Sequence, residues 1–221
     1  MGLYLDGFLI ALKGVPVTVG VSLIAVALGV CLGLGIALMK MSKHWILRIP
    51  ATIYVEIVRG TPIVVQAFIF AYGIPQLLQT NGVPFKWPYL IIPAIMVCSL
   101  NSAAYVAEVI RRGLQAVDKG QMEASRSMGL SYAQTMRLVI LPQALRVMLP
   151  SIINQFIVTL KDTSLLSAIG LRELTQNTKI IVANNMEALT MYFICGVWYW
   201  VVIFILTRAS RAVEKRTKYG R

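Results

Sequence analysis

Five stretches of the chain are apolar over a length that can cross a bilayer. A hydrocarbon core about 30 Å thick requires about 20 helical residues. The strands of a membrane barrel would alternate polar and apolar residues over about ten positions, and these stretches do not alternate. The pattern therefore predicts an all-α, polytopic membrane protein with one transmembrane domain over residues 1–221 and five helices at about 15–39, 47–71, 89–110, 143–160 and 191–206.

The composition supports this interpretation. The chain is 57% hydrophobic and 14% charged, with a mean hydropathy of +0.72. Soluble domains are about 45–50% apolar and about 25% charged. These values exclude a disordered chain, a disulfide scaffold and a soluble nucleic-acid binder, although the net charge is +12. The first apolar stretch follows Asp6 and Lys13 and is too long for a cleaved signal peptide, so we expect a retained helix.

The basic residues indicate the orientation in the membrane. Fifteen of the 21 Lys and Arg residues fall within 40–48, 111–146 and 208–221, which follow the first, third and fifth predicted helices. Short loops rich in Lys and Arg stay on the cytoplasmic side. We therefore expect an outside N-terminus, a cytoplasmic C-terminus and a cytoplasmic loop over residues 111–142.

Chemistry-bearing motifs are absent from the sequence. No GxxxxGK[ST] phosphate loop and no catalytic triad pattern occurs, and the single histidine, His44, stands alone in a basic loop. Cys31, Cys98 and Cys195 fall in three different apolar stretches without CxxC spacing. We expect neither a metal site nor an enzymatic activity in this chain.

The cytoplasmic loop carries a dense set of helix-boundary signals. Asp118 can cap a short helix with Gln121 completing a capping box, and Gly129 suits the left-handed position that ends it. Ser131 and Gln134 can begin a second helix in the same way. The loop therefore predicts a short helix, a sharp corner and a second helix that leads into the membrane.

The short helix also has an apolar side. Met122, Ser125 and Met128 fall at i, i+3 and i+6 and share one face. A cytosolic helix with such a face needs a partner to cover it, although a solvated loop helix is also consistent with this pattern alone.

The same segment carries a family motif. Glu123-Ala-Ser is followed by Gly129 and then by Leu141-Pro142. This order resembles the EAA loop of bacterial ABC-transporter permeases. Ser125 replaces the last Ala of the motif and Val139 replaces its Ile, and both replacements are small.

Three further stretches narrow the resemblance. They are Arg59-Gly-Thr-Pro-Ile-Val-Val-Gln66, Asn101-Ser-Ala-Ala-Tyr-Val-Ala-Glu108 and Leu160-Lys-Asp-Thr-Ser-Leu165. Together with the EAA-like loop they are similar to the polar amino-acid uptake permeases of the histidine, glutamine and arginine class, from about residue 15 to 215. Of the better-known members of that class, the chain most resembles the glutamine permeases.

The resemblance implies a type I importer-like fold in the bacterial plasma membrane. It implies a second permease subunit, either another copy or a related chain, and two cytosolic ATPases that hold ATP and Mg²⁺. It also implies an extracytoplasmic amino-acid-binding protein and no cofactor on this chain. In such permeases the 118–131 segment docks on the ATPase, so the resemblance assigns coupling to Glu123, Ala124, Ser125 and Gly129.

Polar residues inside the predicted helices suggest a pathway or a structural network, because ionisable groups in lipid face protein or water. Glu56 and Arg59 can pair along one helix face, as a gate or as a self-neutralised structural pair, just before a break at Pro62. Asn101 and Glu108 share a face of the third helix and can gate or form interhelical hydrogen bonds.

The end of the fourth helix has the groups that a free amino acid requires. Lys161 and Asp162 can meet a carboxylate and an ammonium, and Thr163, Ser164 and the preceding Asn154 can donate or accept hydrogen bonds. The alternative is an interfacial turn in which the hydroxyls cap the next helix. The resemblance places this stretch along the substrate path.

Other functions remain open at this point. A secondary amino-acid carrier would show inverted repeats, which the sequence lacks, although a dimer could assemble ten helices. A channel subunit would lack a loop that docks on an ATPase. ATP-independent uptake by the chain alone would favour the carrier.

Overall fold

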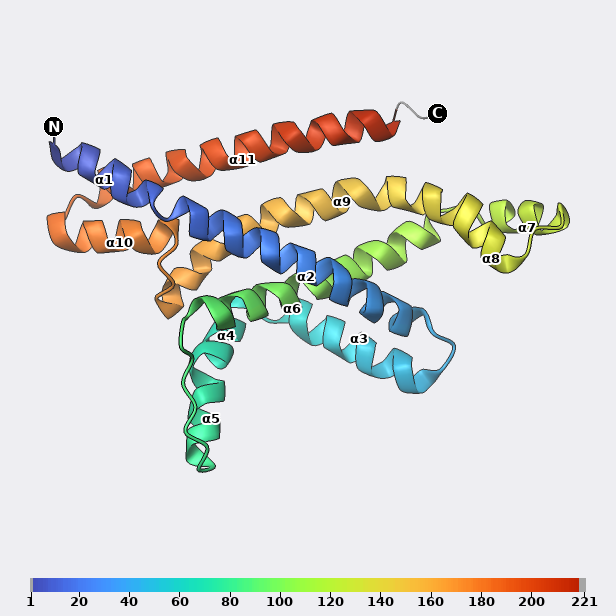
Figure 1. Ribbon diagram of the computed structural model, residues 1–221, viewed down its shortest axis with the longest axis horizontal. Helices are drawn as coiled ribbons and strands as arrows, with labels where there is room; N and C mark the ends of the chain where they lie inside the picture. Colours follow the sequence, from blue (N-terminus) through green and yellow to red (C-terminus); the bar gives the residue numbers. More distant parts are fainter. Residues whose placement is uncertain (1, 219–221) are drawn as a thin grey trace.

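The computed structural model describes residues 2–218, and every regular element in that range is helical (Figure 1). In chain order the elements are α1 (Gly2–Leu12), α2 (Val15–Met41), α3 (Trp45–Gly60), α4 (Ile63–Phe68), the π-helical turn η1 (Ile69–Gly73), α5 (Ile74–Thr80), α6 (Ile91–Gln115), α7 (Lys119–Ser127), α8 (Tyr132–Thr135), the π-helical turn η2 (Met136–Ile140), α9 (Leu141–Asp162), the 3-10 helix η3 (Thr163–Ile169), α10 (Leu174–Asn185) and α11 (Ala188–Lys218).

Within the described residues, five helical stretches are long and apolar enough to cross a membrane. They are Gly7–Met41, Ile63–Thr80, Ile91–Gln115, Tyr132–Ile169 and Ala188–Ala209. The prediction of five spans is confirmed, and four of them overlap the predicted ranges closely. These four are longer than the predicted runs, chiefly because the first also includes part of α1 and the fourth also includes α8, η2 and η3.

The second span differs from the prediction. A helix over 47–71 was expected, but α3 stops at Gly60 and the span begins at Ile63. Thr61 and Pro62 have extended backbones, with ψ of 144° and 135°. Proline disfavours helical geometry in the residue before it and lacks an N–H to continue the ladder. The break at Pro62 is therefore confirmed, and it leaves α3 as a separate helix of 16 residues.

The centre of the bundle is the contact between α2 and α6 (Figure 1). A Cβ added to Gly29 would lie 2.7 Å from Ser102 Cβ, and one on Gly33 would lie 2.9 Å from the Ala103 carbonyl oxygen. Small residues allow this close approach in a membrane, where packing replaces the hydrophobic effect as the force between helices. Helix α6 is the most buried of the five spans, since 67% of its most apolar 18-residue stretch is buried.

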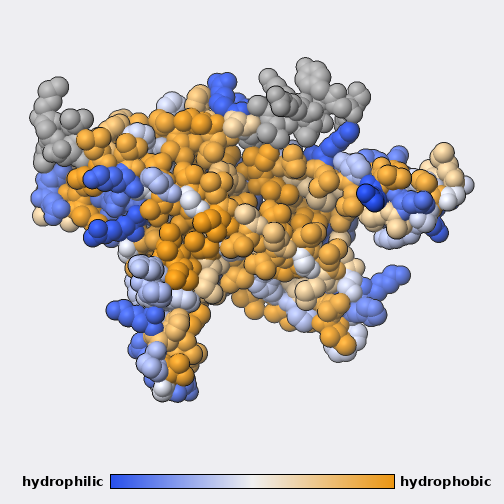
Figure 2. Space-filling model, viewed as in Figure 1, coloured by the Kyte–Doolittle hydropathy of each residue, from blue (hydrophilic) through white to orange (hydrophobic). Residues whose placement is uncertain are grey.

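The outer surface of the bundle is apolar. Figure 2 shows a broad orange body with hydrophilic residues gathered at the projecting ends. Large side chains such as Leu38, Ile57 and Phe193 are more than half exposed within the chain, at 58%, 59% and 72%. Such a surface would be unstable in water and is suited to lipid or to further helices.

Glu173 fixes α10 to the rest of the bundle. Its carboxylate caps α10 by accepting hydrogen bonds from the backbone N–H groups of Thr175 and Gln176, at 2.8 and 2.7 Å, and it accepts a third from the Tyr199 hydroxyl of α11 at 2.8 Å. The Leu174 N–H donates to Thr18 Oγ1 of α2 at 3.2 Å. Burial raises the pKa of Glu173, and the hydrogen bonds partly offset that effect.

Candidate functional site

The short helix α7 is tied down at its start. Asp118 is the N-cap, and its Oδ1 accepts from the backbone N–H of Gly120 at 2.6 Å. The predicted capping box with Gln121 is wrong, because Gln121 Oε1 instead accepts from Gln143 Nε2 of α9 at 3.3 Å. The side chain that was expected to close the cap thus connects α7 to the helix that enters the membrane.

The end of α7 is a tight corner, as predicted. Gly129 has a φ of +88°, and the N–H groups of Gly129 and Leu130 donate to the carbonyls of Arg126 and Ser125. Ser131 and Gln134 then form a complete capping box, with distances of 2.8 and 3.3 Å. Caps on both sides of the corner fix the direction of α7 relative to α8.

The predicted apolar face of α7 is divided. Ser125 is buried at 8% exposure, whereas Met128 is 85% exposed. Met122 lines a pocket of about 490 Å³ between α7, α8 and the end of α6, together with Leu114, Val117, Tyr132, Met136 and others. Glu123 and Ala124 are exposed. Thus Ser125 packs inward while Glu123, Ala124 and Met128 are open to a partner at the projecting end of the molecule (Figure 1).

Glu108 is the centre of a charged cluster at the end of α6. Its carboxylate accepts from Lys40 of α2 at 3.1 Å and from Arg112 at 3.2 Å, and it forms a close bond with Arg111. The residue is 7% exposed. The cluster therefore holds the end of α2 against α6, about two turns before α6 ends at Gln115. No local spacing could have identified Lys40 as a partner, because it lies 68 residues away.

The predicted pair between Glu56 and Arg59 is wrong: the structure places no ion pair between them. Arg59 instead lies over the ring of Tyr105, with its guanidinium carbon 5.1 Å from the ring centroid. The side chains of Glu56 and Arg59 are both exposed on α3. The long arginine side chain reaches the neighbouring helix, so the cation–π contact replaces the pairing that the i, i+3 spacing indicated.

Asn101 of α6 faces the break between α3 and α4. Its amide donates to Gln66 Oε1 at 3.4 Å, and Gln66 Nε2 donates to the Val58 and Thr61 carbonyls at 2.8 and 3.2 Å. Gln66 therefore satisfies the Val58 carbonyl, which the missing N–H of Pro62 leaves open, and the Thr61 carbonyl at the break itself. Asn101 and Glu108, predicted on one face, thus belong to two separate networks.

A second polar link crosses the bundle centre from α6 to α9. The hydroxyls of Ser102 and Thr159 lie 3.0 Å apart, and Gln155 Nε2 donates to Thr159 at 3.4 Å. All three residues are buried. Ser102 is far from Gln155 and Thr159 in the sequence, and only the packing of α6 against α9 brings the three side chains together.

The predicted substrate stretch is only partly available to a ligand. Thr163 is completely buried and its hydroxyl donates to the Leu160 carbonyl at 2.7 Å, so the expectation that it offers a free hydroxyl is wrong. Ser164 donates to the Lys161 carbonyl at 2.7 Å. A hydroxyl after a helical turn bonds back to that turn when no better acceptor is near. Lys161 and Asn154 are exposed, and Asp162 is half-buried.

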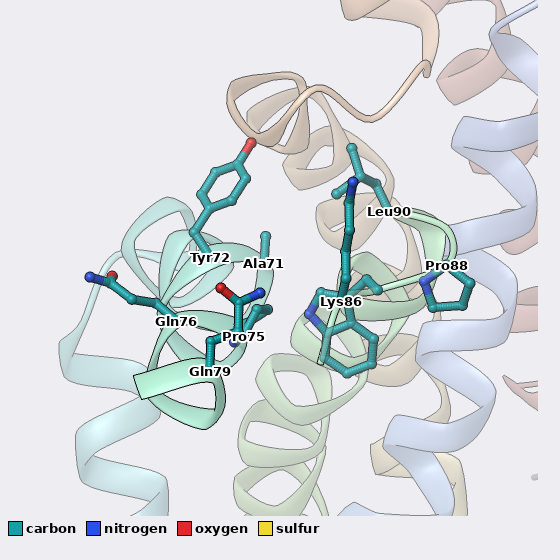
Figure 3. A pocket seen from close by; sticks show the side chains of 9 residues that line it. Ala71, Tyr72, Pro75, Gln76, Gln79, Lys86, Pro88 and Leu90 are labelled. Atoms are coloured by element: carbon teal, nitrogen blue, oxygen red, sulfur yellow. The ribbon is translucent and has the colours of Figure 1, made fainter. Parts of the chain in front are cut away.

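A pocket that the sequence did not indicate lies between α5 and the loop before α6 (Figure 3). Its volume is about 720 Å³, and Lys86 and Gln79 lie on opposite sides of it. The Tyr72 hydroxyl donates to the Ile169 carbonyl at the end of η3 at 2.9 Å. Residues 57–107 contain no Asp or Glu, and this gap in the charge pattern is the signal that could have drawn attention to Lys86.

Comparison with known proteins decides the family. Residues 29–219 match the family described as "Binding-protein-dependent transport system inner membrane component". The chain belongs to this family. The permease is 38% identical to the "Probable amino-acid ABC transporter permease protein YckA" of Bacillus subtilis, over 97% of this chain and 92% of that protein. It is 36% identical to the glutamine transport system permease GlnP of Escherichia coli K12, over 94% and 92%.

Solved structures agree with the sequence relatives. The permease superimposes on a chain of the "Crystal structure of an amino acid ABC transporter with histidines" with a TM-score of 0.86, 38% identity and 94% coverage of both chains. A chain of the MetNI methionine ABC transporter shares the fold, with a TM-score of 0.76 at 20% identity. The permease is therefore an amino-acid ABC transporter permease subunit, with a type I importer fold and a multi-pass location in the inner membrane.

Proposed function

We propose that this permease moves a polar amino acid, with glutamine as the favoured cargo, into the cytoplasm by alternating access. It works as one of two membrane subunits, driven by two cytosolic ATPases that hydrolyse ATP with Mg²⁺. It has no ATPase site of its own and binds no cofactor, and an extracytoplasmic binding protein delivers the cargo. The N-terminus is outside and the C-terminus is cytoplasmic, in agreement with the distribution of Lys and Arg.

The observation that carries this proposal is the double capping of α7. Helix α7 is held by Asp118 at its start and by the Gly129 corner and the Ser131 capping box at its end. A rigid helix that exposes Glu123 and Ala124 can transmit the displacement of a docked ATPase, whereas a loop would absorb it.

The displacement has a physical route toward the membrane. Gln121 contacts Gln143 at the start of α9, and a Cβ on Gly113 would lie 2.3 Å from Met148 Cγ. The Glu108 cluster joins α6 to α2 at the same end. These contacts support coupling of α7 to α2, α6 and α9 as one body.

For the cargo, the proposal assigns Lys161 to the carboxylate and Asp162 to the ammonium, with Asn154 and Ser164 in support. These side chains are not closed off by partners of opposite charge, because no ion pair among the described residues engages Lys161 or Asp162. The buried Thr163 is assigned to holding the turn.

Two cysteine substitutions test the docking and the orientation together. Met128→Cys and Met186→Cys replace side chains of nearly equal exposure, 85% and 83%, at opposite ends of the molecule. In a Cys31→Ser background, the cysteine at 128 should cross-link to a P-loop ATPase in cells and react with an impermeant thiol reagent only after permeabilisation. The cysteine at 186 should react from outside and capture no ATPase. Capture of no ATPase at 128, or labelling of 128 from outside, would contradict the proposal.

A secondary carrier is distinguished by a separate measurement. The chain reconstituted alone in vesicles should not concentrate glutamine under an ion gradient. With the ATPase and the binding protein present, uptake should require ATP. ATP-independent accumulation by the chain alone would replace the importer by a carrier.

A further inference from the structure

The last transmembrane helix carries an aromatic and basic stripe that the transport function leaves unused. Trp200, Phe204 and Arg208 follow each other at intervals of four residues, and Arg211 comes one turn later. Positions 215 and 218, both lysine, continue the same helical face by their spacing. We call Trp200, Phe204, Arg208 and Arg211 the α11 stripe.

The planar groups of the α11 stripe are stacked. The Trp200 and Phe204 rings have centroids 5.4 Å apart at an interplanar angle of 26°, and the Arg208 guanidinium carbon lies 5.0 Å from the Phe204 centroid. A cation held over a ring keeps its N–H edge available for an anion. The stack therefore presents an oriented guanidinium where the span ends, at Ala209.

The α11 stripe has no partner within the described part of the chain. Of the five spans, α11 is the least buried, since only 11% of its most apolar 18-residue stretch is buried within the described residues. Trp200 is 64% exposed. Figure 1 shows α11 along the edge of the bundle opposite α3 and α5 in that view. Arg208 and Arg211 are exposed, and no described carboxylate lies within 4.0 Å of either.

The required partner has two chemical parts. It must be apolar beside Trp200 and Phe204, inside the membrane span, and anionic beside Arg208 and Arg211 at its edge. A soluble protein cannot reach the rings, and a free phosphate would leave them exposed. Residues 208–221 hold six cations and a single carboxylate, Glu214, so a negatively charged headgroup is favoured over a zwitterionic one.

From this we infer that the α11 stripe is a binding site for one anionic glycerophospholipid. The phosphate lies between the guanidinium groups of Arg208 and Arg211, and an acyl chain lies along Phe204 and Trp200. The basic C-terminal part of α11 thus binds a specific lipid, in addition to contributing to the orientation of the chain in the membrane.

The test uses the full-length permease in detergent and native mass spectrometry. Dioctanoyl-phosphatidylglycerol and dioctanoyl-phosphatidylcholine are the probes, offered together at equal concentration. Arg208→Gln with Arg211→Gln should lower the preference for phosphatidylglycerol, by about fivefold for each arginine. Phe204→Leu should lower it by about twofold to fivefold, because the guanidinium loses its support.

A matched variant separates a site from diffuse charge. Lys43→Gln with Arg48→Gln removes two exposed cations, one from the loop after α2 and one from the start of α3, and should leave the lipid preference unchanged. Each variant must retain the melting temperature and the monodispersity of the parent before its preference is compared.

Four results would overturn the inference. Equal retention of both lipids would remove the headgroup preference. Equal losses in the two double variants would show diffuse electrostatics. Displacement of the lipid by glycerol phosphate would indicate a soluble phosphate site. Loss of the ATPase from the purified complex in the Arg208/Arg211 variant, with the lipid preference intact, would make the stripe a protein contact.

Discussion

The segment from Asp118 to Gln134 and the polar positions inside the membrane differ in how their contacts are made. In the segment, Asp118, Gly129 and Ser131 act on atoms two to four residues away. Inside the membrane, Lys40 meets Glu108 and Ser102 meets Thr159 across 68 and 57 residues. The first region is rigid by local hydrogen bonds, whereas the second is held only while the helices stay packed.

The sharpest test of the second region is Glu108→Gln. The substitution leaves Lys40, Arg111 and Arg112 close together without their shared carboxylate. Breaking a buried ion pair by removing one partner costs about 3–5 kcal/mol, and the exposure of Arg112, 69% for its side chain, places this site near the lower value. We expect a clear fall in the melting temperature of the purified permease.

Glu123→Gln is the matched control, because Glu123 is an exposed carboxylate in the first region. Its free energy of unfolding should change by no more than about 0.5 kcal/mol, as for an ordinary surface substitution, so its melting temperature should stay close to that of the parent. Equal losses from the two substitutions would show that Glu108 is not a structural centre.

The first region is tested by Gly129→Val. A side chain at a φ of +88° costs about 1–2 kcal/mol, and a β-branched residue is the least tolerant. We expect normal membrane insertion but loss of ATP hydrolysis stimulated by the binding protein and cargo. Gly196→Val is the control, because nothing lies within 4 Å of a Cβ at Gly196. Wild-type uptake by the Gly129 variant would contradict the coupling role of α7.

Substitutions at Lys161, Asp162 and Thr163 distinguish a charged contact with the cargo from a structural role in the turn. Lys161→Ala and Asp162→Ala should lower transport about tenfold or more, since a charge-assisted hydrogen bond is worth about 1.5–3 kcal/mol. Thr163→Val removes only a hydroxyl bonded to the Leu160 carbonyl and should change stability by about 1 kcal/mol, with little effect on the transport rate. Uptake assays of assembled complexes measure both. If Thr163→Val alone impaired transport, the assignment of Lys161 and Asp162 would be wrong.

The smallest expected effect is a pH dependence at Glu173. Burial raises its folded-state pKa, so the folded state binds this proton more tightly than the unfolded chain does. The corresponding stability is complete below the unfolded pKa of about 4.3 and is lost as the pH rises through the folded pKa. The stability of the Glu173→Gln variant relative to the parent should therefore be higher at pH 7.5 than at pH 5. Paired melting curves of the two proteins at each pH measure this difference. A relative change in the opposite direction would contradict the assignment.

Much of the first region could be predicted because its signals are local. The corner at Gly129 and the Ser131 capping box follow from backbone geometry within a few residues, and so does the break at Pro62 outside this region. Within this segment the capping box expected at Gln121 did not form, because Gln143 offered a competing partner from another helix.

The sequence by itself determined that the chain forms five apolar spans, where the backbone turns and which segment is capped on both sides. These features depend on run length, on proline and glycine geometry and on nearby hydrogen bonds. Only the tertiary structure decided that Arg59 lies on Tyr105, that Glu108 binds Lys40 and that Thr163 is buried. Helical spacing fixes which face a side chain occupies, but the packing of α2, α6 and α9 decides what that face meets.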